Sequence, residues 1–518
     1  MFKILKWSAI ILLIIILGLV IYIYSNLKDR NPGYEINLNI KPTIEGPLYA
    51  GFGVKSISPQ VPDTWEDINN DAQYNPKDGD TYNDGNENGK FDAVWMAGFD
   101  NKRAANGIHD DLWARTMIID DGSTRLAIVS LDAIGFFHDE VIDVRKRISP
   151  DAGITYAIIA STHTHEAPDL MGLWGASDFK SGIDPEYIEY VKSQTVLSIE
   201  EAAKNLQPAI FRFARNLSDL SHLVTDTRKP IVMDAGLLVM QAINKETQLT
   251  LGSLVAWADH PETLWSDNLQ ITSDFPHYVR EGVEKGIYIN DSLLIPGIGG
   301  TAIYMNGAIG GLMTTHPDLS IVDPWTGETF LEPSFEKAWS QGNQIAAVSL
   351  LALQESSDTL DQGNLSLIAK TIHLPMDNSL FRIGASLGLF DRGLSGWITM
   401  RTELSLFSIG PASFATFPGE IYPEIINGGI DTPVGQDIDT DPVEIPPIRQ
   451  LMKGKYKFIF GMANDELGYI IPKSEWDVEA PYIYEAVKSP YGEDNSLGPD
   501  TAPILHGAFK LMATEFYK

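Results

Sequence analysis

An uninterrupted apolar segment near the N-terminus constrains this chain more than any other feature. The run WSAIILLIIILGLVIYIY occupies residues 7–24, and Ser8 is its one clearly polar member. As a helix it approaches the length that crosses the hydrocarbon layer of a membrane. A secretory signal has a shorter apolar region and a cleavage site of small residues, whereas bulky residues continue here into IYIYSNLKDR. We therefore expect residues 7–25 to form an uncleaved transmembrane anchor.

The charges beside this segment decide its orientation only weakly. Lys3 and Lys6 precede it, and Lys28 and Arg30 follow it, so both flanks are basic. We expect residues 1–6 to be a short cytoplasmic tail and the large acidic part of the chain to lie outside the cytoplasm, at the cell membrane. Residues 26–48 mix polar residues with Pro and Gly, which predicts a linker, and the folded body is expected over residues 49–518.

Charge and cysteine content exclude several classes of protein. The chain has 518 residues and a formal net charge of −31. It lacks the clustered Lys and Arg residues that nucleic-acid binding needs. No cysteine is present, which excludes disulfides, thiolate metal sites and a cysteine nucleophile. Any zinc site must then use His, carboxylate, Tyr or water.

The body alternates short apolar runs with amphipathic helical stretches. RLAIVSLDAIGFF, from Arg125, and TYAIIAST, from Thr155, have the composition of buried strands, and the segment from Pro185 to Leu206 has helical periodicity. This alternation predicts an α/β fold with mixed β-sheets flanked by helices in one large domain. In such folds the loops that leave the strand ends build the ligand site.

Four of the predicted strand ends carry residues suited to a metal. STHTHEAPDL follows one strand and contains His163 and His165, which would share a face of an extended backbone. The others end at His260, at Glu420 and near Tyr469. Each piece alone has an ordinary explanation, since HxH occurs by chance, PGE is a common turn and a tyrosine often only packs. Together they predict a zinc site.

These motifs resemble the catalytic domain of the neutral or alkaline, non-lysosomal ceramidases. The matching stretches are THTH at 162–165, ADHP at 258–261, PGE at 418–420, NDELGY at 464–469 and YEAVKSPYG from Tyr484. The resemblance implies a zinc-dependent amidase with the ligands His163, His260, Glu420 and Tyr469. It further implies that His165 holds or polarises the attacked carbonyl, and that Arg228, in TRKP, positions the substrate.

The chain departs from that family in two respects. It stops soon after a predicted C-terminal helix, without the family's immunoglobulin-like domain. Gly311, in NGAIGGLMT, stands where the family has its nucleophilic serine. Zinc lowers the pKa of bound water to about 7, so we expect attack by zinc-bound water without an acyl-enzyme. Thr314 and Thr315 are the nearest hydroxyl groups in sequence that could replace the serine.

A short acidic repeat precedes the predicted strands of the body. DINNDAQYN, from Asp67, and DGNENGKFD, from Asp84, share oxygen-bearing side chains at positions one, three, five and nine. This spacing is typical of the calcium loop of an EF-hand, although no flanking helices are evident. An acidic surface loop without an ion is the alternative. The possible calcium ligands within residues 67–92 are Asp67, Asn69, Asp71, Asp78, Asp84, Asn86, Asn88 and Asp92.

The sequence therefore predicts a membrane-anchored, extracytoplasmic zinc hydrolase that cleaves an amide of an N-acyl lipid, such as ceramide, or a related acyl bond. Its cofactors would be Zn²⁺ and, if the acidic loops bind an ion, Ca²⁺, and its partners the lipid substrate and the membrane. The alternative is a catalytically degenerate binding or surface protein that keeps the ceramidase-like scaffold. Retention of the full set of metal-ligand residues favours the enzyme.

Overall fold

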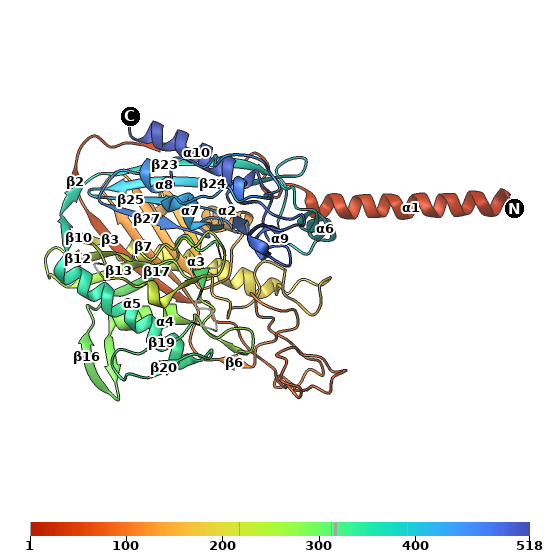
Figure 1. The fold of residues 1–518 in the computed structure, drawn as a ribbon, viewed down its shortest axis with the longest axis horizontal. Coiled ribbons are helices and arrows are strands. Elements are labelled where there is room, and N and C mark those ends of the chain that lie inside the picture. The colour runs from red at the N-terminus through yellow and green to blue at the C-terminus, as the bar shows by residue number, and fades with distance from the viewer. Residues whose placement is uncertain (1, 217, 312, 315–318, 391) are drawn as a thin grey trace.

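The protein is built from two β-sheets that pack face to face, with helices on their outer sides (Figure 1). The computed structural model describes residues 2–216, 218–311, 313–314, 319–390 and 392–518. Apolar side chains from both sheets, including Ile128, Phe211 and Phe414, form the central core. The mixed α/β class expected from the sequence is confirmed.

The larger sheet has nine strands, and His163 and His260 follow two of them. Its order is β17-β13-β12-β10-β3-β7-β8-β9, and β21 pairs with β10. The strand β8 is buried almost throughout and pairs in parallel with β9, as expected for near-continuous apolar runs. The strands are β3 (Tyr49–Ser56), β7 (Trp113–Asp120), β8 (Arg125–Leu131), β9 (Tyr156–Ser161), β10 (Gln207–Arg215), β12 (Leu238–Asn244), β13 (Thr250–Ala256), β17 (Thr301–Met305) and β21 (Ser357–Leu360).

The smaller sheet has five strands in the order β1-β23-β24-β25-β27. Its strands β25 and β27 run parallel, so the segments that follow them leave the sheet at the same end. Those segments carry Glu420 and Tyr469. The strands are β1 (Asn37–Ile40), β23 (Leu365–Pro375), β24 (Thr399–Ile409), β25 (Ala412–Thr416) and β27 (Tyr456–Phe460).

Helices cover the outer faces of both sheets. α3 lies on β3 and β7, α4 lies on β17, α5 packs against α4 and lies on β10 and β12, and α10 covers the smaller sheet. α3 begins where the sequence predicts, because Asp184 caps its first amides and Pro185 occupies its first turn. The helices are α1 (Phe2–Leu27), α2 (His138–Arg147), α3 (Pro185–Lys204), α4 (Phe275–Glu284), α5 (Phe335–Glu355), α6 (Ser379–Leu387), α7 (Pro423–Asn427), α8 (Ile448–Leu451), α9 (Tyr491–Asp494) and α10 (Thr501–Phe516).

Short two-stranded ribbons complete the fold. Most lie in the connections between the larger elements, and one of them, β26 with β28, joins the two segments that carry Glu420 and Tyr469. The pairs are β2 (Gly46–Pro47) with β22 (Gln362–Gly363), β4 (Thr64–Glu66) with β5 (Thr81–Asn83), β6 (Gly107–Ile108) with β14 (Gln270–Ile271), β11 (Thr225–Asp226) with β18 (Met313–Thr314), β15 (Gly286–Ile289) with β16 (Ser292–Pro296), β19 (Ile321–Val322) with β20 (Thr329–Phe330), and β26 (Glu420–Ile421) with β28 (Tyr469–Ile470).

The helix α1 projects away from the body as a single rod (Figure 1). Residues Lys3–Leu27 are long and apolar enough to cross a membrane, two properties that signal sequences share. The following segment differs from the expected linker, because β1 pairs with β23 from Asn37 to Ile40 as an edge strand. The ordered body therefore begins before Tyr49.

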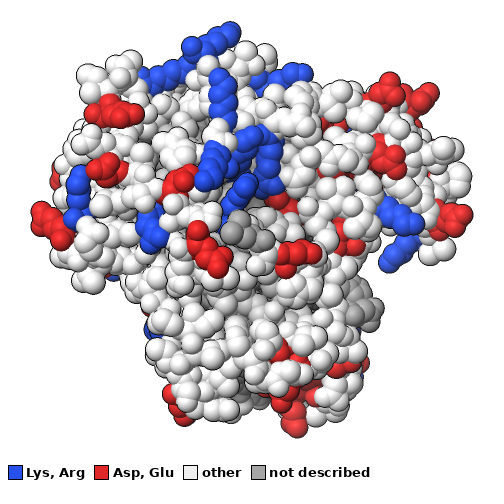
Figure 2. Space-filling model, turned by 60° about the vertical axis from the view of Figure 1, so that its left-hand side comes forward, with Lys and Arg blue, Asp and Glu red and all other residues white. Residues whose placement is uncertain are grey.

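The excess of negative charge is not spread evenly over the surface. On the face shown in Figure 2, Lys and Arg side chains gather in a band across its upper part. Asp and Glu side chains are dispersed around that band and over the rest of the face. The net charge of −31 is thus an average over regions of unlike sign.

Candidate active site

The two histidines of THTH lie directly beyond the end of β9. His163 has φ 68°, so the backbone is not extended there, and the prediction that the pair shares one face of an extended strand is wrong. The chain turns because Thr162 N donates to Leu131 O and His163 N donates to Ala133 O, both at 2.9 Å. The turn still brings the two imidazoles together, with 5.0 Å between their ring centroids.

His260 joins this pair from the end of β13. Its ring centroid lies 5.0 Å from that of His163 and 5.8 Å from that of His165. The backbone fixes the approach, since His165 N donates to Pro261 O at 3.0 Å. One ligand atom from each of the three histidines lies within 4.8 Å of the other two, which is close enough to hold a metal ion.

Glu420 and Tyr469 reach the histidines from the smaller sheet. Glu420 Oε2 lies 3.0 Å from His260 Nε2 and 3.6 Å from His163 Nε2. β26 pairs with β28 in parallel, with Glu420 opposite Tyr469, and the two side chains are hydrogen-bonded. Asn464 holds this segment against the larger sheet, because its side-chain oxygen accepts from Ile159 N at 2.8 Å. We call His163, His165, His260, Glu420 and Tyr469 the strand-end cluster.

The hydrogen bonds of the strand-end cluster fit a metal centre. His163 Nδ1 donates to Ile134 O at 2.6 Å, which leaves its Nε2 with a lone pair directed toward Glu420. Backbone carbonyls commonly orient metal-binding histidines in this way. The donor set of imidazole, carboxylate and phenol suits zinc, which takes nitrogen and oxygen ligands. The structure thus brings together all five residues that the sequence predicts for this centre.

Burial favours the neutral form of His163 and His165, which metal ligation requires. It lowers the pKa of His163 to about 4, with the charge of Glu420 acting in the opposite direction. The pKa of His165 is also lowered by burial and by its histidine neighbours. Burial alone would raise the pKa of Glu420, but the nearby histidines outweigh that effect and hold it below its usual value.

His165 differs from the other two histidines because its ring nitrogens lack hydrogen bonds of normal geometry. The nearest carboxylate oxygen, Glu262 Oε2, lies 3.4 Å from its Nδ1. Buried polar atoms usually have a hydrogen-bond partner. The two ring nitrogens of His165 are therefore candidates to contact a ligand or substrate. Glu262 is a site residue that sequence reasoning missed, although it stands two positions after His260 in HPE.

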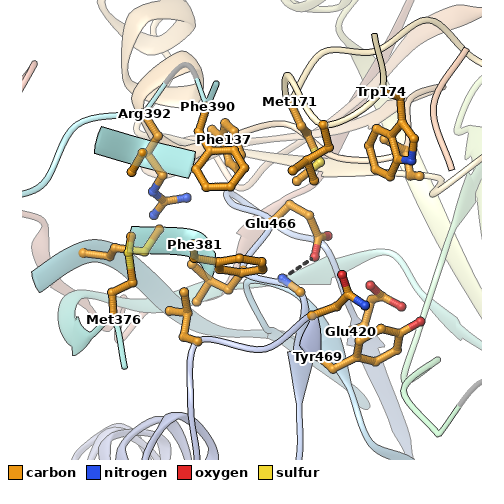
Figure 3. Close-up of a pocket in the computed structure, with 18 of the residues that line it drawn as sticks. Phe137, Met171, Trp174, Met376, Phe381, Phe390, Arg392, Glu420, Glu466 and Tyr469 are labelled. Atoms are coloured by element: carbon orange, nitrogen blue, oxygen red, sulfur yellow. Dashed lines mark hydrogen bonds between the residues drawn. The ribbon is translucent and has the colours of Figure 1, made fainter. Parts of the chain in front are cut away.

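An apolar cavity of about 830 Å³, counting the space at its open mouth, leads to the strand-end cluster. Figure 3 shows Phe381, Phe390 and Met376 toward one end and Glu420 and Tyr469 toward the other. Sequence reasoning did not find this cavity, because its walls come from segments far apart in the chain. Its labelled apolar walls are Phe137, Met171, Trp174, Met376, Phe381 and Phe390.

A second carboxylate, Glu466, lies in the wall of this cavity. Its Oε1 accepts from Gly468 N at 2.9 Å, drawn as a dashed line in Figure 3, and its Oε2 has no hydrogen-bond partner. Burial raises its pKa, and the charge of Glu420 adds to the effect. Burial therefore favours the protonated form of Glu466, which would present a hydrogen-bond donor in an apolar space. No local sequence pattern indicates this role.

The segment that contains Gly310 and Gly311 lies beside Glu420. Gly310 N donates to Ile421 O at 3.0 Å, which places the glycine pair against β26. Gly311 has φ +79°, and a side chain there would meet Asp226 Oδ1 at 3.2 Å from its Cβ. A larger residue would be strained in this conformation. Thr314 ends β18, whereas Thr315 lies outside the described residues.

Arg228 lies within a polar network beside the site and is absent from the cavity wall as described. Its guanidinium donates to Glu493 Oε1 at 2.7 Å and Oε2 at 3.0 Å, and to the hydroxyl of Tyr422. Burial would lower its pKa, but Tyr422 and Glu493 outweigh burial and raise it. The ring of Tyr422 lies 6.2 Å from that of Tyr469. Arg228 thus contacts the cluster through another side chain.

The two acidic loops have similar internal geometry. Asp67 accepts from the amides of Asp71 and Ala72, and Asp84 accepts from those of Asn88 and Gly89. In both loops the first position therefore binds the amides of positions five and six. The first loop lies between β4 and β5 without flanking helices, as the sequence indicated.

Buried carboxylates secure both loops at their bases. Asp80 accepts from Ile68 N at 3.1 Å and from Asn75 N at 2.7 Å. Asp63 accepts from Gly85 N at 3.0 Å and from Asp92 N at 2.7 Å. The loops are therefore ordered by the protein itself. Their remaining carboxylates, Asp71, Asp78 and Asp92, accept from asparagine side chains of their own loops.

Comparison with known proteins identifies the fold. No protein-family model and no curated protein matches the chain. The solved neutral ceramidase from Pseudomonas aeruginosa is similar over 90% of this chain and 74% of its own, with a TM-score of 0.60 and 15% identity. A structure described as ceramidase complexed with C2 matches over 91% and 75%, with a TM-score of 0.63 and 15% identity. At this identity the likeness shows a ceramidase-like fold.

Proposed function

We propose that this protein is a membrane-anchored, extracytoplasmic, zinc-dependent hydrolase that cleaves the amide bond of an N-acyl lipid or a related acyl bond. One observation carries the proposal: five potential metal ligands meet at the inner end of an apolar cavity. A buried metal site in such a cavity suits a substrate with a long hydrocarbon chain and a single polar bond. The ceramidase-like fold supports the same reaction class.

The zinc ion would be held by His163, His260, Glu420 and Tyr469. When bound, zinc supplies Lewis-acid polarisation of a carbonyl and a lowered pKa for water. The chain itself contributes the orientation of these ligands, through Ile134 O on His163 and the β26 to β28 pairing. It also excludes bulk water, since all four side chains are buried.

His165 and Glu262 form the second part of the proposed mechanism. Glu262 lies on the Nδ1 side of His165 and would favour the tautomer with a proton on Nδ1. Nε2 would then accept a proton from the attacking water. The resulting imidazolium of His165 could return that proton to the departing amine. The low pKa of His165 makes it neutral before the reaction, as a proton acceptor must be.

We expect no acyl-enzyme, because Gly311 has no side chain and its conformation disfavours one. Substrate incubated with the protein should leave no covalent adduct in intact-mass measurements. The double variant Thr314→Ala, Thr315→Ala should keep most of its activity. Acyl transfer to either threonine would instead establish nucleophilic catalysis.

Arg228 is proposed to position the substrate indirectly, by holding the side chain of Tyr422. Its bidentate pair with Glu493 and its contact with the Tyr422 hydroxyl support this indirect role.

The acidic loops of residues 67–92 are proposed to bind Ca²⁺ for stability. The matching geometry of the two first aspartates, and the carboxylates that bond asparagine side chains within the same loops, support that role.

The test is metal analysis of the purified full chain, followed by assays on a panel of N-acyl lipids and short-chain amides. We expect stoichiometric zinc, and loss of both zinc and activity in His260→Ala. The matched control is His222→Ala, whose ring bonds Gln344 at 3.2 Å outside the cluster. Absence of any bound metal would contradict the proposal. Full zinc occupancy with no hydrolysis across the panel would favour the degenerate binding protein.

A further inference from the structure

The helix α6 is apolar on two opposite faces. Phe381 and Ala385 line the cavity from its inner face. Leu380, Ile383 and Leu387 form a stripe on its outer face, with exposed fractions of 64%, 55% and 40%. Their spacing of three and four residues puts them on one side of the helix. A helix that is apolar all round is normally covered on every side, and this stripe is exposed.

Trp397 extends the same apolar surface. It is 91% exposed, and the hairpin that carries it lies beside the start of α6, because Met376 N donates to Ile398 O at 3.0 Å. Tryptophan is enriched where proteins meet the interface of a membrane. We call Leu380, Ile383, Leu387 and Trp397 the apolar rim.

The membrane-length helix α1 leaves the body at this rim (Figure 1). Tyr22 Oη donates to Leu387 O at 2.7 Å, and Asn26 Nδ2 donates to Ser386 O at 3.0 Å. Just beyond α1, Asp29 pairs with Arg401 at 2.5 Å. These contacts join the end of α1 rigidly to the body, so the direction of the helix determines which face of the body meets a membrane.

The lengths agree with this geometry. The 26 residues of α1 rise about 39 Å, whereas the hydrocarbon layer is about 30 Å thick. Its last turns, which contact α6, would therefore lie in the interfacial layer. Leu387 contacts those turns directly, so the rim lies at the same depth.

We propose that the apolar rim is seated in the leaflet of the bilayer that α1 crosses, so that lipid enters the cavity directly from that leaflet. The occupant of the rim is thus the interfacial layer of the membrane, where the lipid headgroups meet the upper acyl chains. The inner face of α6 continues the same apolar surface into the cavity through Phe381 and Ala385. The seating of the rim rests on the membrane anchoring in the proposed function, and lipid entry rests in addition on the proposed hydrolysis.

The absence of cysteine allows a direct test on the full chain. Ile383→Cys and Trp397→Cys each introduce one thiol for an environment-sensitive fluorophore, in nanodiscs of zwitterionic phosphatidylcholine. The matched control is Leu249→Cys, because Leu249 is 69% exposed and precedes β13, at the opposite end of that strand from His260. We expect spin-labelled lipid to quench the probe at 383 and 397 strongly, and aqueous iodide to quench it at 249.

Equal iodide quenching at all three positions, with little lipid quenching at 383 and 397, would overturn the seating of the rim. Thermal melts of the three labelled variants check that each remains folded. This outcome does not depend on catalysis, so it separates the seating of the rim from the proposed hydrolysis.

A kinetic experiment tests lipid entry. Ile383→Ser combined with Trp397→Ser should raise KM several-fold for an N-acyl lipid presented in vesicles. It should leave kcat/KM for a soluble short-chain amide unchanged, because the rim lies outside the strand-end cluster. An equal loss on both substrates would contradict entry from the leaflet. Failure of the parent protein to hydrolyse either substrate would refute the proposed function and leave the quenching result standing.

Discussion

Two buried polar clusters lie between the sheets, and they differ in how completely their atoms are paired. In the first, the Arg145 guanidinium donates to both oxygens of Glu403, at 2.5 and 2.9 Å, and Tyr156 Oη donates to Glu403 at 2.7 Å. Arg145 also donates to Ala157 O. We call Arg145, Tyr156 and Glu403 the inter-sheet cluster. In the strand-end cluster, by contrast, both nitrogens of His165 lack normal hydrogen bonds.

The difference separates a structural role from a chemical one. A buried charge is tolerated when its partners satisfy it, and removal of one partner leaves the other uncompensated. The inter-sheet cluster is of this kind, and it joins α2, β9 and β24. The strand-end cluster keeps unsatisfied atoms in place, which lowers stability unless a ligand satisfies them. Variants should therefore affect stability in one cluster and binding in the other.

The largest effect is expected from Glu403→Gln. It leaves the Arg145 charge buried without its counterion and should lower the free energy of unfolding by about 3–5 kcal/mol. Urea unfolding of the full chain in detergent measures this. Arg145→Met combined with Glu403→Met should recover much of the loss, because no charge then remains. If Glu403→Gln were as stable as the parent, the distinction between the clusters would fail.

The next effect is expected from His260→Ala. Loss of one ligand should lower activity by about 100-fold or more and release the metal. Without metal, this variant should be less stable than the metal-free parent by about 2 kcal/mol, because the hydrogen bond between His260 and the Glu420 carboxylate is lost. Metal analysis and unfolding in chelator provide the two readouts. A large loss of stability in the metal-free state would make this cluster structural as well.

A buried carboxylate without a cationic partner sharpens the comparison. Asp169 accepts from the amides of Met171, Gly172 and Trp174 in the loop that lines the cavity, and burial raises its pKa to about 6. The folded state therefore holds this proton more tightly than the unfolded state. Its contribution to stability is full below pH about 4 and is lost as the pH rises through about 6.

The stability of the parent relative to Asp169→Asn should consequently fall by roughly 2–3 kcal/mol across that interval. Unfolding curves at several pH values measure this difference. The contribution of Glu403 to stability should have the opposite pH dependence, because Arg145 outweighs burial and lowers the pKa of Glu403. A difference independent of pH would mean that Asp169 titrates normally.

The smallest effect concerns the acidic loops. If residues 67–92 bind calcium, added Ca²⁺ should raise the melting temperature by a few degrees, corresponding to about 1 kcal/mol. Asp67→Ala combined with Asp84→Ala should abolish the response. A chelator too weak to remove zinc keeps the strand-end cluster loaded. An identical melting temperature with calcium and with chelator would leave an ordered acidic loop with no ion.

The sequence predicted those parts of the molecule that depend on local pattern. The apolar run of α1, the alternation of strands and helices, and His163, His260, Glu420 and Tyr469 at strand ends could all be identified from neighbouring residues. The parallel strands β25 and β27 carry Glu420 and Tyr469 to the same end of the smaller sheet. The extended backbone expected at His163 was wrong, because hydrogen bonds to Leu131 and Ala133 turn the chain there.

The remaining features depend on contacts between distant segments. Arg145 and Glu403 are 258 positions apart, and neither position has a local pattern that predicts the other. Glu466 acquires its role from burial in a cavity whose walls come from several segments. The edge strand β1 was expected to be a linker, since pairing with β23 leaves little trace in a short polar sequence.

The rigid joint between α1 and the body has a consequence for how turnover would be regulated. A protein held in this way by Tyr22, Asn26 and Asp29 cannot tumble to collect substrate from the surrounding solution. If it acts on lipid, its rate follows the mole fraction of substrate in its own membrane. Addition of inert lipid would then slow the reaction, whereas dilution of the whole suspension would leave it unchanged.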